Sequence, residues 1–348
     1  MKKTLKIIGI VLAVLLLLAL ALAGAAFIYV DSILGRMNYV ASDTTVTPEV
    51  ASSIDREEWV TTAPDDTSPV IDPTDVTFPT DLPGMEDQGK EIVNIMLVGQ
   101  DARPGESAQR SDSMILMTFN KTTGEITLTS FLRDQYVQIP GFGNTKLCHS
   151  YSYGGMTLMN QTIENHYGVE IDGNVTFSFE GFEKIIDMLG GVEISLTAEE
   201  AHALNCLESK QNWGLKEGIQ RLTGKQALRY ARLRHIDSDF QRTERQRKVI
   251  MSVIETYKNC SLSEMFKILE ETMPLITTNI PKKDIYAYAI NLFPMLSGAQ
   301  MKTQQMPAAG TFQSGLIRVS EGYMASCQYN IDFAANREIL NKIFDDQT

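Results

Sequence analysis

The chain has 348 residues, of which 43% are apolar and 21% charged, with 43 acidic and 31 basic residues and a net charge of −12. This composition is typical of one large or two modest globular domains and excludes a disulfide-stapled miniprotein or a disordered tail. The acidity also argues against a nucleic-acid-binding protein. Residues 41–90 alone hold twelve acids and two bases, so the rest of the chain can still present a basic site.

The first thirty residues predict a membrane anchor. Residues 1–6 contain three lysines, and residues 7–30 contain no charge. At about 1.5 Å per residue a helix over 7–30 reaches about 36 Å, enough to cross a hydrocarbon core of about 30 Å. By the positive-inside rule, residues 1–6 are a cytoplasmic tail and the rest of the chain is extracellular. A cleaved signal peptide is the alternative, because Ala21-Leu22-Ala23 resembles a cleavage site, although signal-peptide apolar regions are shorter.

Residues 31–90 are predicted to form an acidic extracellular linker. The stretch 41–90 holds six of the twelve prolines and shows no sustained periodicity, so it cannot bury enough surface to offset the entropy of ordering. Repelling carboxylates and prolines should keep this linker extended and hold the following domain away from the membrane. The alternative is a small accessory subdomain around Trp59.

Residues 91–348 have the pattern of a folded domain. Apolar alternation predicts three consecutive strands, Ile92–Gly99, Ser113–Asn120 and Ile126–Leu132, with a hairpin turn at residues 121–124. A fourth strand is expected at Val192–Leu196. Apolar periodicity and end signals predict helices at Met156–His166, Phe182–Leu189, Gly224–Tyr230, Asp239–Tyr257, Leu262–Thr272, Lys282–Leu296 and Phe333–Phe344. This irregular order favours a central mixed sheet covered by helices on both faces.

Several common sites are not supported by the sequence. The four histidines are scattered without metal-ligand spacing, so a zinc site or a serine–histidine triad is not predicted; they are His149, His166, His202 and His235. No glycine-rich loop ends in Gly-Lys-Ser/Thr. The four cysteines allow three complete pairings, and spacing does not choose among them. We favour a Cys206–Cys327 bridge, with four free thiols as the alternative.

Six of the fourteen arginines fall within Arg229–Arg247. A solvated basic helix face is the usual meaning of such a charge run. However, Arg242, Arg245 and Gln246 share one face of the helix predicted from Asp239, beside the positive end of the helix dipole. This arrangement favours an anion.

Two further arginines precede that helix. Arg232 and Arg234 are two positions apart, so they point to the same side if this segment is extended. Guanidinium groups that converge on a helix N-terminus match phosphate oxygens in pairs. The sequence therefore predicts a site for a pyrophosphate-sized ligand.

A second cluster is expected at one edge of the sheet. Asp101 follows the first strand, Arg110 and Asp112 precede the second, and Arg133 follows the third. Because the three strands run up, down and up, these residues should come together. Structural ion pairs are the simplest interpretation. The functional one is a Mg²⁺ site, since Mg²⁺ needs only one or two carboxylates together with phosphate oxygens.

These segments together resemble the LytR-CpsA-Psr family, from about Asn94 to the C-terminus. The matching stretches are NIMLVGQDAR, RSDSMILMTFN, ITLTSFLRD, KLCHSYSYGG, GFEKIIDMLGGVEISL and GIQRLTGKQALRYARLRHIDSDFQRTERQ, with a weaker match through TTNIPKKDI and the last helix. The resemblance implies a short cytoplasmic tail, one membrane helix and an extracellular αβα-sandwich domain in a Gram-positive envelope. It also implies a phosphotransferase that moves anionic glycopolymers, such as wall teichoic acid or capsule, from undecaprenyl pyrophosphate to peptidoglycan with Mg²⁺.

The resemblance assigns roles to individual residues. Asp101 and Asp112 match the metal carboxylates and, with Arg133 and Arg232, the catalytic set. The pyrophosphate-binding positions are Arg110, Arg133, Arg232, Arg234, Arg242 and Gln246, and Arg103 and Lys146 also match motif positions. Two positions depart from the family pattern: Leu132 replaces a common proline, and Cys148 replaces a common asparagine.

Two alternative functions stay open at this point. The same site could hydrolyse a lipid pyrophosphate with water as the nucleophile. A non-catalytic envelope protein could instead bind polyprenyl phosphates to sense or scaffold wall assembly. In the transferase, a sugar hydroxyl attacks, the lipid phosphate leaves, and a carboxylate such as Asp101 or Asp112 accepts the proton.

Overall fold

The computed structural model describes residues 27–41, 45, 47–48, 70–79, 82, 91–101, 110–206, 212–234, 236–296, 298–320 and 323–344. The predicted tail 1–6, most of the predicted span 7–30 and most of the segment 41–90 lie outside these ranges, as do Arg103 and His235. Asp101 and Arg110 are described in their backbone only. Within the described ranges, no helix combines the length and apolar character needed to cross a membrane.

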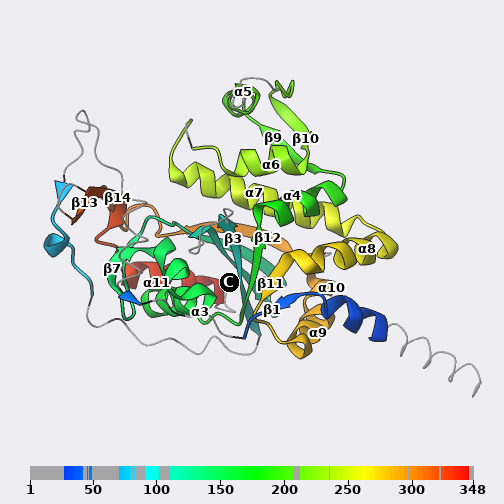
Figure 1. Ribbon diagram of the computed structural model, residues 1–348, viewed down its shortest axis with the longest axis horizontal. Coiled ribbons are helices and arrows are strands. Elements are labelled where there is room, and N and C mark those ends of the chain that lie inside the picture. Colours follow the sequence, from blue (N-terminus) through cyan, green and yellow to red (C-terminus); the bar gives the residue numbers. More distant parts are fainter. Residues whose placement is uncertain are drawn as a thin grey trace, which may run out of the picture.

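A seven-stranded mixed sheet forms the centre of the molecule, in the order β1–β11–β8–β3–β4–β5–β12 (Figure 1). Its strands are β1 (Asn38–Tyr39), β3 (Ile92–Asp101), β4 (Arg110–Asn120), β5 (Glu125–Phe131), β8 (Gly173–Ser178), β11 (Ile276–Thr278) and β12 (Gln300–Met306). The predicted antiparallel meander is confirmed as β3, β4 and β5, and parallel partners, β8 and β12, flank it. The predicted central mixed sheet is therefore confirmed.

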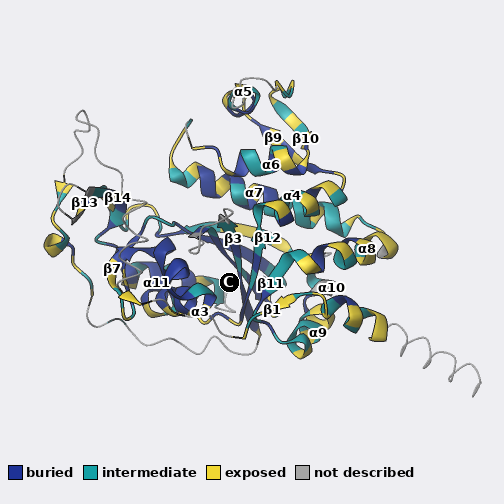
Figure 2. Ribbon diagram, viewed as in Figure 1, coloured by how far each residue is buried: buried dark blue, intermediate teal, exposed yellow. Residues whose placement is uncertain are grey.

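Helices cover both faces of this sheet, and Figure 2 shows buried residues concentrated between the layers. On one face, Met96 and Leu116 pack with Met159 of α3 and Leu340 of α11. The other face is covered by α4, α7, α9 and α10. The helices are α3 (Leu147–Tyr167), α4 (Phe179–Met188), α5 (Ala198–Cys206), α6 (Gly224–Ala231), α7 (Asp239–Lys258), α8 (Leu262–Thr272), α9 (Lys282–Asn291), α10 (Phe293–Leu296) and α11 (Phe333–Phe344).

Smaller sheets extend the body. The hairpin of β9 (Val192–Leu196) and β10 (Gly218–Leu222) shares an apolar core with α4, α5, α6 and α7. A three-stranded sheet is formed by β2 (Val70–Ile71), β13 (Gln313–Ser320) and β14 (Tyr323–Tyr329), and β6 (Tyr136–Ile139) pairs with β7 (Gly143–Lys146). A 3-10 turn, η1, covers Pro73–Asp75.

Parts of the predicted linker 31–90 belong to the folded body. Within it, residues 31–34 are helical, β1 pairs with β11, and β2 pairs with β13. The expected domain boundary at residue 91 is therefore wrong for these pieces. They are short, and backbone pairing with distant strands orders them, so local composition gave no signal of it.

Two helices differ from prediction. The predicted helix Lys282–Leu296 is divided into α9 and α10, because Pro294 lacks the N–H that a continuous helix needs. Helix α3 begins nine residues before the predicted Met156 and is interrupted at Gly154 and Gly155, the latter with φ of 57°. The prediction captured only the part after this break. The part before it begins directly after Lys146.

Candidate functional site

A β-bulge places Asp112 at the edge of the central sheet. Gly99 pairs with Ser113 and Gln100 pairs with Ser111, so Asp112 is the extra residue on β4. A bulge turns neighbouring side chains to one side of the sheet and is common beside active sites. Asp112 and Ser113 accordingly line the same pocket. The local backbone therefore aims this carboxylate at the layer that contains α7.

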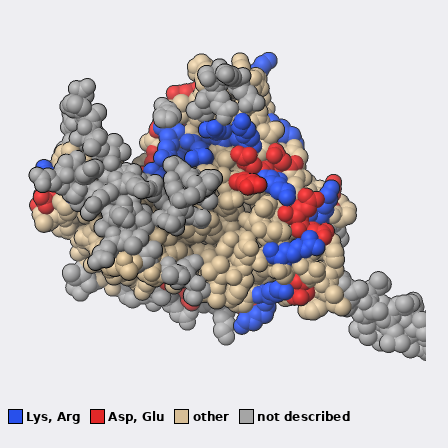
Figure 3. Space-filling model, in the orientation of Figure 1, with Lys and Arg blue, Asp and Glu red and all other residues tan. Residues whose placement is uncertain are grey.

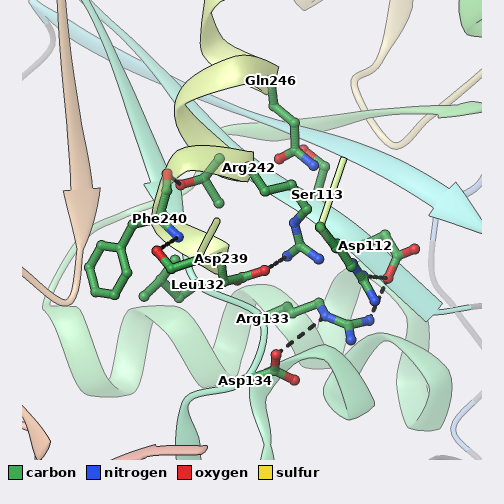
Figure 4. Close-up of polar contacts among 12 residues, drawn as sticks. Asp112, Ser113, Leu132, Arg133, Asp134, Asp239, Phe240, Arg242 and Gln246 are labelled. Carbon is green, nitrogen blue, oxygen red and sulfur yellow. Dashed lines mark hydrogen bonds and ion pairs between the residues drawn. The ribbon is translucent and has the colours of Figure 1, made fainter. Parts of the chain in front are cut away.

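Ion pairs of alternating charge run through Asp112 (Figure 4). Its Oδ1 is 2.7 Å from Nη1 of Arg133, whose Nε is 3.5 Å from Oδ2 of Asp134. Asp134 Oδ1 in turn lies 2.9 Å from Nζ of Lys146. All four side chains are between 10% and 18% exposed, so water screens these interactions only in part. The predicted contact between Asp112 and Arg133 is therefore confirmed.

The segment between α6 and α7 brings two more arginines to Asp112. Leu233 is buried in the core beneath β9 and α6, while Arg232 and Arg234 on either side of it are exposed. Nη2 of Arg234 lies 3.6 Å from Oδ1 of Asp112, and the guanidinium of Arg232 lies 4.2 Å from the ring centroid of Phe179. The segment is not extended at Arg232, which caps the C-terminus of α6 with φ of −109° and ψ of 4°, but exposed and buried residues still alternate from Arg232 to Arg234.

Arg242 enters the site from the first turn of α7. It is 2% exposed, and its Nη2 lies 2.5 Å from Oδ1 of Asp239. In the described part of the chain, neither Nε nor Nη2 of Arg242 makes a hydrogen bond of good geometry. Burial lowers the pKa of Arg242, and Asp239 only partly opposes this shift. Burial raises the pKa of Asp239, against the effect of Arg242. An anion bound beside Arg242 would supply acceptors for the guanidinium nitrogens that lack a hydrogen bond.

Gln246 lies one turn after Arg242. The hydroxyl of Ser113 donates a hydrogen bond to Oε1 of Gln246 at 3.0 Å, which joins α7 to β4. Figure 4 shows Arg242 and Gln246 on the same side of α7, above Asp112 and Arg133. Both residues therefore lie where the sequence placed them.

Arg245 does not share this position, and the predicted common face is wrong for it. Its Nη1 and Nη2 make 2.6 and 2.7 Å hydrogen bonds to the two carboxylate oxygens of Asp237, and Nη2 also donates to the carbonyl of Leu233. Glu200 Oε1 lies 3.5 Å away. These charge-assisted hydrogen bonds hold the loop before α7 against the helix, so Arg245 is used by the fold and does not face the site.

An apolar pocket opens beside the charged cluster, and sequence reasoning did not find it. Asp112, Arg232 and Gln246 form its polar side. The remaining lining is mainly apolar and comes from β8, α4, α6 and α7: Phe177, Phe179, Phe182, Leu228, Ala231 and Ile250. The helical spacing of these residues is equally consistent with ordinary core, so only the fold separates the two. Figure 3 shows Lys and Arg gathered on the face where α6 and α7 lie.

The described backbone brings the remaining predicted residues to this edge. Asp101 pairs with Arg110 at the ends of β3 and β4, two positions from Asp112. The described chain contains no group of three or more His, Cys, Asp or Glu that could hold a metal ion. Among the described residues, the two ion pairs of Asp112 use Oδ1, so Oδ2 is the candidate ligand for a cation. Such a donor set suits Mg²⁺, which completes its shell with phosphate oxygens and water.

The cysteines are free, so the favoured Cys206–Cys327 bridge is wrong. Cys206 is exposed on α5, whereas Cys327 is buried in β14 on another part of the molecule (Figure 1). Cys148 is buried at the start of α3, where its N–H donates to the carbonyl of Arg133 at 3.1 Å. Through this bond Cys148 positions the backbone of Arg133, and its thiol is not assigned a role in the reaction.

The model of the LytR_cpsA_psr family matches residues 53–332. The chain belongs to this family. The match begins well before the Asn94 at which the resemblance was first visible, in agreement with the ordered pieces of the predicted linker. At Leu132, where the family commonly has proline, the N–H donates to the carbonyl of Met306 at 2.9 Å. This departure therefore extends the contact between β5 and β12 by one bond.

Similar curated proteins include two named polyisoprenyl-teichoic acid–peptidoglycan teichoic acid transferases. TagT of Bacillus subtilis (strain 168) is 33% identical over 216 residues, which cover 61% of this chain and 66% of the relative. TagU of Enterococcus faecalis (strain ATCC 700802 / V583) is 30% identical over 250 residues, which cover 70% of this chain and 79% of the relative. The alignments thus span from about two thirds to four fifths of these relatives.

Solved structures of the same family have the same fold. TagT bound to LIIa-WTA is 28% identical, with a TM-score of 0.59 over 74% of this chain and 91% of that one. TagT with bound octaprenyl pyrophosphate lipid is 26% identical, with a TM-score of 0.56 over 74% and 92%. The fold of this chain is therefore one that accommodates a polyprenyl pyrophosphate in a relative.

Proposed function

We propose that this protein is a phosphotransferase that moves an anionic glycopolymer from a polyprenyl pyrophosphate carrier to peptidoglycan. The observation that carries the proposal is the combination of two surfaces at one sheet edge. A cluster of cationic side chains around Asp112 adjoins a pocket lined by phenylalanine, leucine and isoleucine. A lipid pyrophosphate has the same two parts, a highly charged head and an apolar tail.

Charge balance supports an anionic ligand. Among the described side chains, five cations surround the site, and three carboxylates accompany them, namely Asp112, Asp134 and Asp239. The cations are Arg133, Lys146, Arg232, Arg234 and Arg242. The excess of positive charge suits phosphate oxygens, which guanidinium groups bind in pairs. The names of the relatives, with teichoic acid as the transferred polymer, support the same substrate class.

The proposed reaction is an in-line phosphoryl transfer. A sugar hydroxyl of the acceptor attacks the phosphorus that carries the polymer, the bond to the bridging oxygen breaks, and the lipid phosphate leaves. Arg133, Arg234 and Arg242 neutralise charge on the phosphates as it shifts to the leaving group. A carboxylate at this edge, Asp101 or Asp112, accepts the hydroxyl proton.

We propose Mg²⁺ as the cofactor, held by Asp112 and Asp101. When bound, the ion would polarise phosphate oxygens and add positive charge to the site. Asp112 would then bind the cation through the oxygen that its arginine pairs do not use, while Arg133 and Arg234 keep the carboxylate in place.

We also propose that residues 7–30 anchor the protein in the cell membrane, with the folded domain outside the cell. The uncharged run and the preceding lysines support this topology. Protease added to intact protoplasts should digest the domain. Protection until the membrane is lysed would disprove the outside location.

The decisive experiment separates transfer from binding. Asp112→Asn removes the carboxylate but keeps the shape, so we expect lipid pyrophosphate binding to persist while Mg²⁺-dependent polymer transfer falls by orders of magnitude. Glu193→Gln is the control, because it removes an exposed ion pair with Arg221 on the distant β9–β10 hairpin. If Asp112→Asn transfers polymer at the parent rate, or the parent binds lipid but transfers nothing, the transferase proposal fails in favour of a binding protein.

A further inference from the structure

Exposed apolar side chains concentrate in one region outside the site. The described residues include eight exposed large apolar side chains, and five of them lie on residues 27–34, α8 and α9: Phe27, Ile28, Tyr29, Phe266 and Ile290. Two ring contacts bring these elements together. Tyr29 packs edge-on against Phe266 at 6.0 Å, and Phe27 stacks on Tyr286 at 5.3 Å. Contiguous apolar patches on a protein surface usually mark an interaction site.

The helix of residues 27–34 is docked firmly on the domain. Asp31 accepts hydrogen bonds from Nζ of Lys282 at 3.1 Å and from the hydroxyl of Tyr286 at 3.2 Å. Arg36 pairs with Glu270 of α8 at 3.0 Å, and Ile33 is only 3% exposed. The chain then continues into β1, which pairs with β11. A long flexible spacer therefore does not begin directly after residue 30.

The contacts also define the direction of this helix. Asp31 lies beside Lys282, and Phe27 lies beside Tyr286, one turn further along α9. The helix therefore runs antiparallel to α9, and its N-terminal end points toward Ile290, the next residue on the same stripe. Figure 1 shows this helix in blue beside α9 and α10, and Figure 2 shows exposed positions along both. Phe27, the first described residue, therefore lies within this apolar patch.

We propose that the patch formed by residues 27–34, α8 and α9 rests on the outer surface of the lipid bilayer. The inference rests on the membrane anchor of the proposed function, because the uncharged run 7–30 ends on this patch. Aromatic and aliphatic side chains beside a membrane helix are favoured at the level of the lipid headgroups. In this arrangement the domain lies directly against the membrane, instead of being held away from it by residues 31–90.

A matched pair of positions tests the proposal in the full-length protein. Ile290 on α9 and Ile219 on β10 are both 73% exposed, but Ile219 belongs to the hairpin at the other end of the molecule. Each is changed to cysteine and spin-labelled in a Cys206→Ser/Cys260→Ser background, which leaves the two buried cysteines in place. The proteins are reconstituted in phosphatidylglycerol–phosphatidylethanolamine nanodiscs. Collisions with lipid-soluble O₂ are compared with collisions with a water-soluble nickel chelate.

The label at Ile290→Cys should collide more with O₂ than with the chelate, and the label at Ile219→Cys should show the reverse ratio. Equal, water-like ratios in a chain that co-migrates with the nanodiscs would overturn the membrane contact and leave the anchor intact. Spin–spin broadening at Ile290→Cys would assign the patch to a second copy of the chain. A chain that does not co-migrate with nanodiscs would disprove both the anchor and the contact.

Discussion

Arg242 and Arg245 lie one turn apart on α7, and both side chains are 2% exposed, yet their surroundings are opposite. Asp237 binds two nitrogens of Arg245, and a carbonyl binds one of them as well. Arg242 has one close carboxylate in poor hydrogen-bond geometry. Burial alone would lower the pKa of Arg245, but Asp237 and Glu200 raise it above its usual value, whereas burial lowers the pKa of Arg242.

The difference shows that burial does not decide the role of an arginine. Asp237 holds both terminal nitrogens of Arg245, and only its Nε lacks a hydrogen bond among the described residues, so this charge contributes to the fold and its removal leaves its partners unpaired. Arg242 lacks a hydrogen bond of good geometry at Nη2 as well as at Nε, so it keeps a terminal donor for a ligand. We therefore assign Arg245 to the scaffold and Arg242 to the pyrophosphate site.

The largest effect on stability is expected for Arg245→Ala. This change leaves the carboxylates of Asp237 and Glu200 without their partner, which should lower the free energy of unfolding by about 3–5 kcal/mol. Urea titration of each variant measures the free energy of unfolding. Arg242→Ala, the matched variant, should cost much less, because few good hydrogen bonds are lost. Equal losses in the two variants would contradict the division.

Binding should respond in the opposite order. Arg242→Ala removes charge-assisted hydrogen bonds to the pyrophosphate, each of which contributes about 1.5–3 kcal/mol, so lipid affinity should fall about 10- to 100-fold. Titration of a short-chain polyprenyl pyrophosphate into the folded variant measures this loss. Unchanged affinity would remove Arg242 from the site. Arg247→Ala is a control on the same helix, since its Nη1 donates to Ser130 in the core.

A smaller effect is expected where the cationic and apolar parts of the site meet. The guanidinium of Arg232 lies over the ring of Phe179, and exposed cation–π contacts contribute about 0.5–1 kcal/mol. Phe179→Leu keeps the pocket apolar but removes the ring, so lipid affinity should fall about two- to fivefold. The same titration tests this prediction. A loss as large as that of Arg242→Ala would mean that the aromatic ring contributes far more to lipid binding than its contact with Arg232 explains.

The smallest effect is a proton uptake on binding. Burial already raises the pKa of Asp239, and a nearby pyrophosphate adds negative charge that raises it further. At about pH 5, above the ordinary aspartate pKa of about 3.9, binding should therefore draw a fraction of a proton from solution. Calorimetry in buffers of different ionisation enthalpy measures this uptake. It should disappear in Asp239→Asn, and its persistence there would assign it to another group.

The sequence alone determined the elements that rely on local signals. The strands β3, β4 and β5 and the turn between β4 and β5 are confirmed, because their apolar residues are buried on both faces of the sheet. Helix α8 matches its predicted bounds, and a capping box of Ser261 and Glu264 defines its start. The meeting of Asp112 with Arg133 followed from strand direction alone. The sequence motifs also indicated the family, which the family model confirms, and with it the substrate class.

The tertiary structure decided whatever depends on a distant partner. The polar sequence of β12 gives no strand signal, and this edge strand exists through pairing with β5, more than 170 residues away in the chain. The separate roles of Arg242 and Arg245, the apolar pocket and the docking of residues 27–34 on α9 likewise depend on which side chains the fold brings into contact. Sequence spacing places a residue on a face, but only packing determines what that face meets.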